Sequence, residues 1–283
     1  MIRLDAATVL LQWSVGGLFF LWFTTRRRLI GIGYGWLLRG VYLVLVIGAI
    51  AAGRIIQPDG WRDASALGVA LATTVALVVS IVRRKAGVSG ERTSEERRSS
   101  RVAAMTGIDR DTKVVDHSRP EFPPWLDLLA PAIGVIALLF AALSDGGPHG
   151  LAIVRTLVGA AFLGAVTDAM LLGHWYLVQP GLGRGLLNEL VKTVAFIWPF
   201  EVAAMLWPTG MVQVLDGHIS DSYGGLLGWF WVACAATTIV LCLVTRAALK
   251  ERYYSAVMAA TGLLYLAILT AFGTDLVARA ILS

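Results

Sequence analysis

Residues 64–82 read ASALGVALATTVALVVSIV and contain no charged side chain. A helix rises about 1.5 Å per residue, so a run of this length spans the roughly 30 Å hydrocarbon core of a bilayer. Its apolar residues lie on all sides of the helix, as expected where a helix faces both lipid and other helices. The pattern favours a helix over a membrane β-strand, because such strands alternate apolar and polar residues over about ten positions.

Seven other runs of the chain have the same character. The eight predicted spans are residues 7–23, 40–56, 64–82, 126–143, 151–174, 186–207, 225–244 and 254–273. The composition agrees, with 57% hydrophobic residues, 15% charged residues and a mean hydropathy of +0.71. Soluble domains carry about 25% charged residues. We therefore expect an all-α, polytopic helical membrane protein with about eight transmembrane helices, forming one integral membrane domain over residues 1–283.

Lysine and arginine residues concentrate in alternate loops. Residues 24–39 carry four arginines and residues 83–119 carry ten basic residues, whereas residues 144–150 and 208–224 carry none. Because cytoplasmic loops hold the excess of Lys and Arg, this pattern predicts that both termini lie on the non-cytoplasmic side of a bacterial-type inner membrane. Basic loops beside anionic lipid account for the net charge of +5, and no nucleic-acid partner is expected.

The longest polar stretch is the predicted cytoplasmic loop 83–125 between the third and fourth spans. It is rich in Ser, Arg and Glu, and residues 92–104 are expected to form a short charged helix. Two interpretations are open, a solvated connector and a docking site for a partner protein. No internal repeat is evident in the sequence.

Ionisable residues inside the spans are costly and tend to mark function or internal pairing. Here they gather in the fifth and sixth spans, at Arg155, Asp168, His174, Glu189, Lys192 and Glu201. The short link 179–185 predicts that these spans form an antiparallel hairpin. When two residues lie at equal depth on the two helices of such a hairpin, the sum of their residue numbers is roughly constant. This rule pairs Arg155 with Glu201, Asp168 with Lys192 and His174 with Glu189. Successive residues turn by about 100°, so two straight helices cannot aim both ion pairs into one seam.

The most distinctive string is DAMLLGHWYLVQP at residues 168–180. It places Asp168, His174 and Tyr176 towards the cytoplasmic face, and Glu189 and Lys192 return there on the sixth span. These five residues are the candidate ligand site, because a quinone needs hydrogen-bond donors, a proton acceptor and aromatic packing. Arg155 and Glu201 are the candidate buried charge pair. An aromatic belt beside a structural ion pair is the alternative interpretation.

Metal and haem chemistry are disfavoured by the small number of ligands. Two cysteines exclude a Cys-rich zinc site, and His174 is the only one of four histidines inside a span. An intramembrane bis-histidine haem needs two histidines at one depth, so no metal site is predicted.

Three functions remain open from the sequence, and no motif decides whether the protein is an enzyme. The first is a subunit of a redox complex that binds a quinone-like ligand near the cytoplasmic face, with partner subunits supplying the electron carrier. The second is a proton-coupled transporter or channel. The third is a non-catalytic structural or assembly subunit.

Overall fold

The computed structural model describes residues 4–91, 93, 120–144, 148–179, 182–208, 210–251 and 253–283. Helices dominate these residues, and no strand occurs among them. Seven helical segments are long and apolar enough to cross a membrane. The prediction of an all-α, polytopic helical membrane protein is therefore confirmed. The expected helix at 92–104 and most of the loop 83–125 lie outside the described residues.

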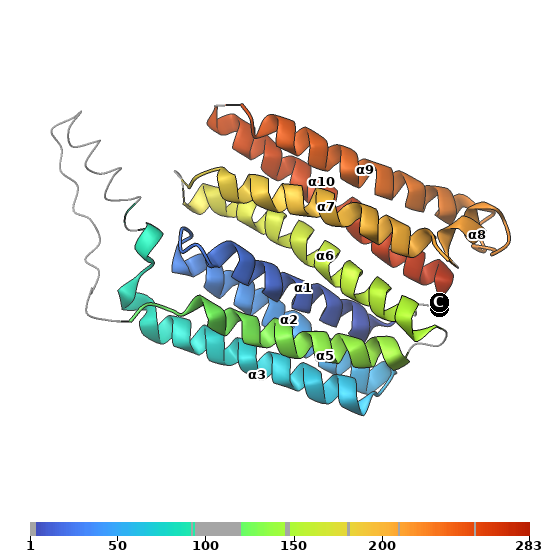
Figure 1. Ribbon diagram of the computed structural model, residues 1–283, viewed down its shortest axis with the longest axis horizontal. Coiled ribbons are helices and arrows are strands. Elements are labelled where there is room, and N and C mark those ends of the chain that lie inside the picture. The colour runs from blue at the N-terminus through green and yellow to red at the C-terminus, as the bar shows by residue number, and fades with distance from the viewer. Residues whose placement is uncertain are drawn as a thin grey trace.

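The first half of the chain folds into a unit of four long helices (Figure 1). These are α1 (Ala6–Thr25), α2 (Ile32–Ile56), α3 (Gly60–Val82) and α5 (Leu129–Ser144). Two short 3-10 helices, η1 (Arg83–Ala86) and η2 (Pro124–Leu128), follow α3 and precede α5. Each long helix packs against the next one, and α5 returns to pack against α1.

The second half repeats this connectivity (Figure 1). Its long helices are α6 (His149–Val178), α7 (Gly185–Leu206), α9 (Leu226–Ala248) and α10 (Tyr254–Leu282), with the short α8 (Met211–Leu215) between α7 and α9. Again each long helix packs against the next, and α10 returns to α6. The two halves therefore share one up-and-down order of helices.

Helix α7 corresponds to the sixth predicted span but is not one of the seven apolar segments. It has 22 residues, and it carries Glu189, Lys192 and Glu201. It packs between α6 and α9, and it forms the expected hairpin with α6. The eighth crossing thus remains a prediction, although the helix is present and lies within the bundle.

The two units meet most closely where α1 crosses α6. A methyl group added to Gly164 would fall on the backbone of Gly16, and one added to Gly16 would fall on the carbonyl of Ala160. Small residues let membrane helices approach to backbone contact, where van der Waals packing stabilises the pair. The side chains of Trp13 and Thr167 add a hydrogen bond of 2.9 Å across the same contact.

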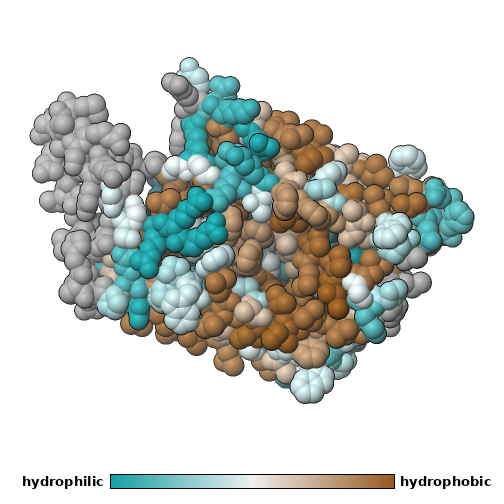
Figure 2. Space-filling view, in the orientation of Figure 1, coloured by the Kyte–Doolittle hydropathy of each residue, from teal (hydrophilic) through white to brown (hydrophobic). Residues whose placement is uncertain are grey.

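The bundle has two chemically different ends. The basic end is where α1 ends and α2 begins, and it carries the arginines at 26–28 together with those of η1. The α8 end is the opposite one, where α8 and the end of α10 lie (Figure 1). Figure 2 shows apolar residues over the middle of the visible face and polar residues towards its two ends. This distribution is that of a helical bundle surrounded by lipid.

Candidate functional site

Asp168 lies on α6 at 0% exposure, facing the first four-helix unit. The hydroxyl of Tyr42 on α2 donates a hydrogen bond to its Oδ1, whereas Oδ2 has no hydrogen-bond partner among the described residues. The ring of Tyr42 reaches this position by lying over Gly17 of α1, where any larger residue would collide with it. Tyr34, about two turns closer to the basic end on α2, is also fully buried and interacts electrostatically with Asp168. A carboxyl group and two phenols thus share one buried site between α1, α2 and α6.

Asp168 and Lys192 do not form a direct ion pair among the described residues. The two residues were expected at the same depth in the membrane. Because each residue turns by about 100° around its helix axis, Asp168 faces α2 whereas Lys192 lies on the exposed surface of α7.

A second buried site lies near the α8 end. It consists of Arg155 on α6, Glu201 on α7, and Asp275 and Arg279 on α10, which we call the charged quartet. Arg155 is 1% exposed and the other three are 0% exposed. Arg279 donates to Asp275 at 2.8 Å, and Glu201 interacts electrostatically with the other three members. Two carboxyl groups and two guanidinium groups therefore lie together inside the bundle. Among the described residues, both oxygens of Glu201 and both Nη atoms of Arg279 have no hydrogen-bond partner.

Arg155 also holds the end of α7. Its Nε donates to the carbonyl of Ala204 at 2.8 Å. The backbone of Gly210 approaches so closely that an added methyl group would come within 2.9 Å of Arg155 Nη2. Met211 and Val214 of α8 are buried in the adjoining apolar cluster. The quartet is consequently covered on this side by the turn that leads from α7 into α8.

Gln12 of α1 brings the first unit to the quartet. It is fully buried, and neither its Oε1 nor its Nε2 has a hydrogen-bond partner among the residues described. Gly159 provides the space, because an added methyl group there would collide with Gln12 Nε2 and meet Asp275 Oδ1 at 2.8 Å. Polar groups of α1 and α10 therefore converge around one glycine of α6.

The sequence argument missed Asp275 and Arg279. The last predicted span ended at residue 273, so neither residue was among the ionisable residues considered inside the spans. In the structure α10 continues to Leu282, and the two side chains form an ion pair four residues apart along it. Asp275 and Arg279 are four residues apart, a spacing that places two side chains on the same face of a helix. A predicted helix extended past residue 273 would therefore have indicated this ion pair.

The remaining candidate ligand residues face different neighbours at the basic end. His174 is exposed, and its ring contacts that of Tyr265 with centroids 6.4 Å apart. The hydroxyl of Tyr176 donates to the carbonyl of Gly183 at 2.7 Å. These two residues, two positions apart in the sequence, thus have different surroundings.

Glu189 is part of an ion-pair group that joins α7 to the end of α1. Its carboxylate lies 3.4 Å from Arg26 and 2.9 Å from Arg27. Trp175 is half-buried, packs edge-to-face on Tyr34 and donates to Gln179 at 3.1 Å. Trp175 is therefore packed partly against the bundle, whereas the neighbouring His174 is exposed.

Among the described residues, no group of three or more His, Cys, Asp or Glu side chains could hold a metal ion. Comparison of the chain with protein-family models, curated proteins and solved structures finds no match. Fold and buried polar sites together define the class, a multi-pass helical membrane protein with ionisable groups buried between its helices.

Proposed function

We propose that this protein moves protons across the membrane, as a proton-coupled carrier or a channel, and that Asp168 exchanges the proton. The observation that carries the proposal is a fully buried carboxyl group with one hydrogen bond, from Tyr42, and one unpartnered oxygen among the described residues. Ionisable side chains within membrane spans are expensive and commonly belong to proton or ion pathways. Asp168 and its two phenols supply groups that can accept and donate a proton.

The arrangement along α6 supports the same proposal. Arg155 of the charged quartet and Asp168 are 13 residues apart, which corresponds to about 20 Å of helix. The contact between Gly16 and Gly164 lies between these two polar sites. Two buried polar sites separated by tight backbone packing are the elements that an alternating pathway requires. A relative movement of the two four-helix units would open one site at a time.

The orientation in the proposed function follows from the loop charges, with the basic end in the cytoplasm and both termini outside. The quinone hypothesis remains a prediction, and it has less support, because His174, Tyr176 and Glu189 have separate contacts. The alternative is that the buried charges have a purely structural role. The following experiment distinguishes that role from proton movement.

Purified protein is reconstituted into liposomes containing a trapped pH-sensitive dye, and a potassium diffusion potential with valinomycin drives proton entry. We expect the wild type to acidify the lumen, Asp168→Asn to abolish the response and Tyr42→Phe to slow it. Asp216→Asn, in an exposed loop position, is the matched control and should behave as wild type. Wild-type vesicles that show no proton movement, or Asp168→Asn vesicles that equal the wild type, would overturn the proposal.

A further inference from the structure

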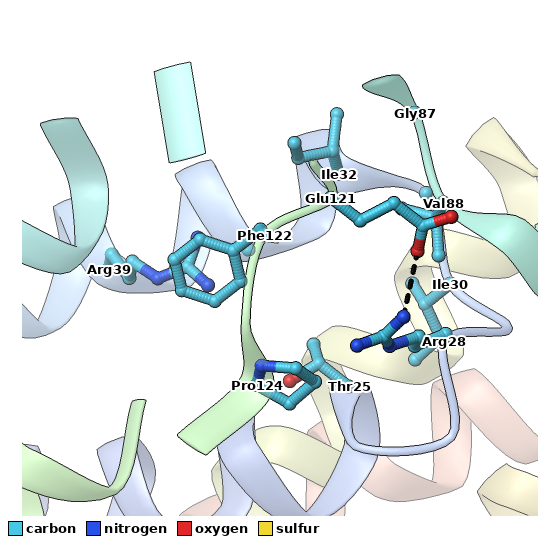
Figure 3. A pocket seen from close by; sticks show the side chains of 12 residues that line it. Thr25, Arg28, Ile30, Ile32, Arg39, Gly87, Val88, Glu121, Phe122 and Pro124 are labelled. Atoms are coloured by element: carbon cyan, nitrogen blue, oxygen red, sulfur yellow. Dashed lines mark hydrogen bonds and ion pairs between the residues drawn. The ribbon is translucent and has the colours of Figure 1, made fainter. Parts of the chain in front are cut away.

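A half-open cavity of about 40 Å³ lies at the basic end, between the start of α2 and the segments that follow α3 and precede α5 (Figure 3). A water molecule needs roughly 10–15 Å³ of such space, so the cavity has room for about three waters or one compact anion. Its lining includes Arg28, Gly31, Ile32 and Arg39. None of these residues belongs to the Asp168 site or to the charged quartet.

One wall of the cavity is the amino-terminal end of α2. This helix has 25 residues, and its N-cap residue is Gly31, which has no side chain to bond the first N–H groups. Gly31 and Ile32 both line the cavity. The N–H of Gly31 donates to the side chain of Gln179 at 3.0 Å, and the dipole of a long helix favours negative charge at this end.

A buried guanidinium group supplies the second, independent feature. Arg39 is 2% exposed, and its Nε and Nη2 donate to the carboxylate of Asp127. Its Nη1 has no hydrogen-bond partner among the described residues and lies beside Gly35, which also lines the cavity. The ring of Phe122 covers the guanidinium at 4.4 Å (Figure 3). Arg39 thus keeps one donor available at the cavity while its other donors hold it in place.

Carboxylates of the chain already lie at this place. Glu121 is paired with Arg28 at 3.1 Å (Figure 3), and a carboxylate oxygen of Glu91 lies 2.7 Å from where a methyl group on Gly31 would be. Arg28 and the start of α2 therefore both lie beside carboxylate oxygens in the folded chain. A phosphate group offers more acceptor oxygens than a carboxylate and forms the same charge-assisted hydrogen bonds with arginine.

We propose that this cavity binds a phosphate group, held by Arg28, Arg39 and the start of α2, in competition with the carboxylate of Glu121. The group belongs either to a lipid headgroup or to free phosphate. Basic residues beside the cavity attract anionic lipids to this end of the bundle.

The test uses the full chain in neutral detergent and measures the thermal unfolding midpoint during two titrations. One titration adds inorganic phosphate against chloride of equal ionic strength, and the other adds short-chain phosphatidylglycerol. A ligand that binds only the folded state stabilises it by RT ln(1 + c/Kd), where c is the free ligand concentration, so the midpoint rises with the logarithm of that concentration once it exceeds Kd. We expect Arg28→Gln to weaken binding about tenfold, which corresponds to about 1.4 kcal/mol. Glu121→Gln should strengthen binding, because the competing carboxylate is removed.

Arg27→Gln is the matched control, since Arg27 neighbours Arg28 in the same loop, pairs with Glu189 and does not line the cavity. It should bind as wild type does. Stabilisation by phosphate alone assigns free phosphate, and stabilisation by the lipid alone assigns a headgroup. Equal weakening in Arg27→Gln and Arg28→Gln, or no stabilisation of wild type and Glu121→Gln by either ligand, would overturn the proposal. Asp168→Asn should bind phosphate as wild type does, because Asp168 does not line the cavity. A failure of the phosphate-binding proposal is therefore distinguishable from a failure of the proposed proton movement.

Discussion

The ion pair between Arg39 and Asp127 should be one of the strongest single contributions to folding. Two hydrogen bonds of 2.8 and 2.7 Å join the side chains, which are 3% and 2% exposed. Arg39→Met removes the guanidinium and leaves the carboxylate of Asp127 buried without its counter-ion. Breaking one half of a buried pair typically costs about 3–5 kcal/mol. We expect Arg39→Met, and likewise Asp127→Leu, to lower the free energy of unfolding by an amount in that range.

The double variant Arg39→Met/Asp127→Leu removes both charges and fills the space with apolar groups. Replacement of a complete buried pair is often nearly neutral, so the double variant should recover most of the loss. A double-mutant cycle should then give a coupling energy of several kcal/mol. Unfolding is followed by circular dichroism in mixed micelles with a rising fraction of sodium dodecyl sulfate.

Arg27→Gln provides the control for this cycle, because Arg27 is half exposed in its ion pair with Glu189. Exposed pairs are worth at most about 1 kcal/mol. The reasoning fails if Arg39→Met costs no more than Arg27→Gln, or if the two single losses simply add in the double variant.

Three further predictions concern packing and capping. Gly164→Val should destabilise by about 1–3 kcal/mol through collision with α1, whereas Gly150→Ala, which meets open space on the same helix, should be neutral in the same unfolding assay. Trp175→Ala should cost about 3 kcal/mol and His174→Ala less than about 0.5, because the tryptophan packs inside and the histidine is exposed; equal losses would contradict this. Backbone N–H donors, that of Gly225 foremost, lower the pKa of Asp221, so its stabilising effect is complete above the ordinary carboxyl pKa of about 3.9. Asp221→Ala should therefore lower the thermal midpoint at neutral pH. The difference from wild type should begin to shrink as the pH falls below about 3.9 and should vanish once the pH lies below the lowered pKa of folded Asp221. A difference that does not change with pH over this range would refute the assignment.

The membrane spans could be predicted from the sequence because the transfer of a helix into lipid depends on the local composition of the chain. Residues 64–82 carry no charge, and the structure has α3 over Gly60–Val82. The hairpin of α6 and α7 was equally readable, since a short link leaves two long helices no other arrangement. Depth along a helix follows from counting residues, which is why Arg155 and Glu201 were expected together and are both members of the charged quartet.

The partner of each buried charge was decided by the packing of helices that are distant in sequence. Asp168 bonds Tyr42, which is 126 residues away, because α1 crosses α6 at Gly16 and thereby brings α2 to that face. Asp127 meets Arg39 in the same way, across 88 residues. Hydropathy is a sum over neighbours in the chain and can be read locally. The face that a side chain presents, and what lies opposite, depends on helix rotation and on the order of helices in the bundle, which exist only once the whole chain has folded.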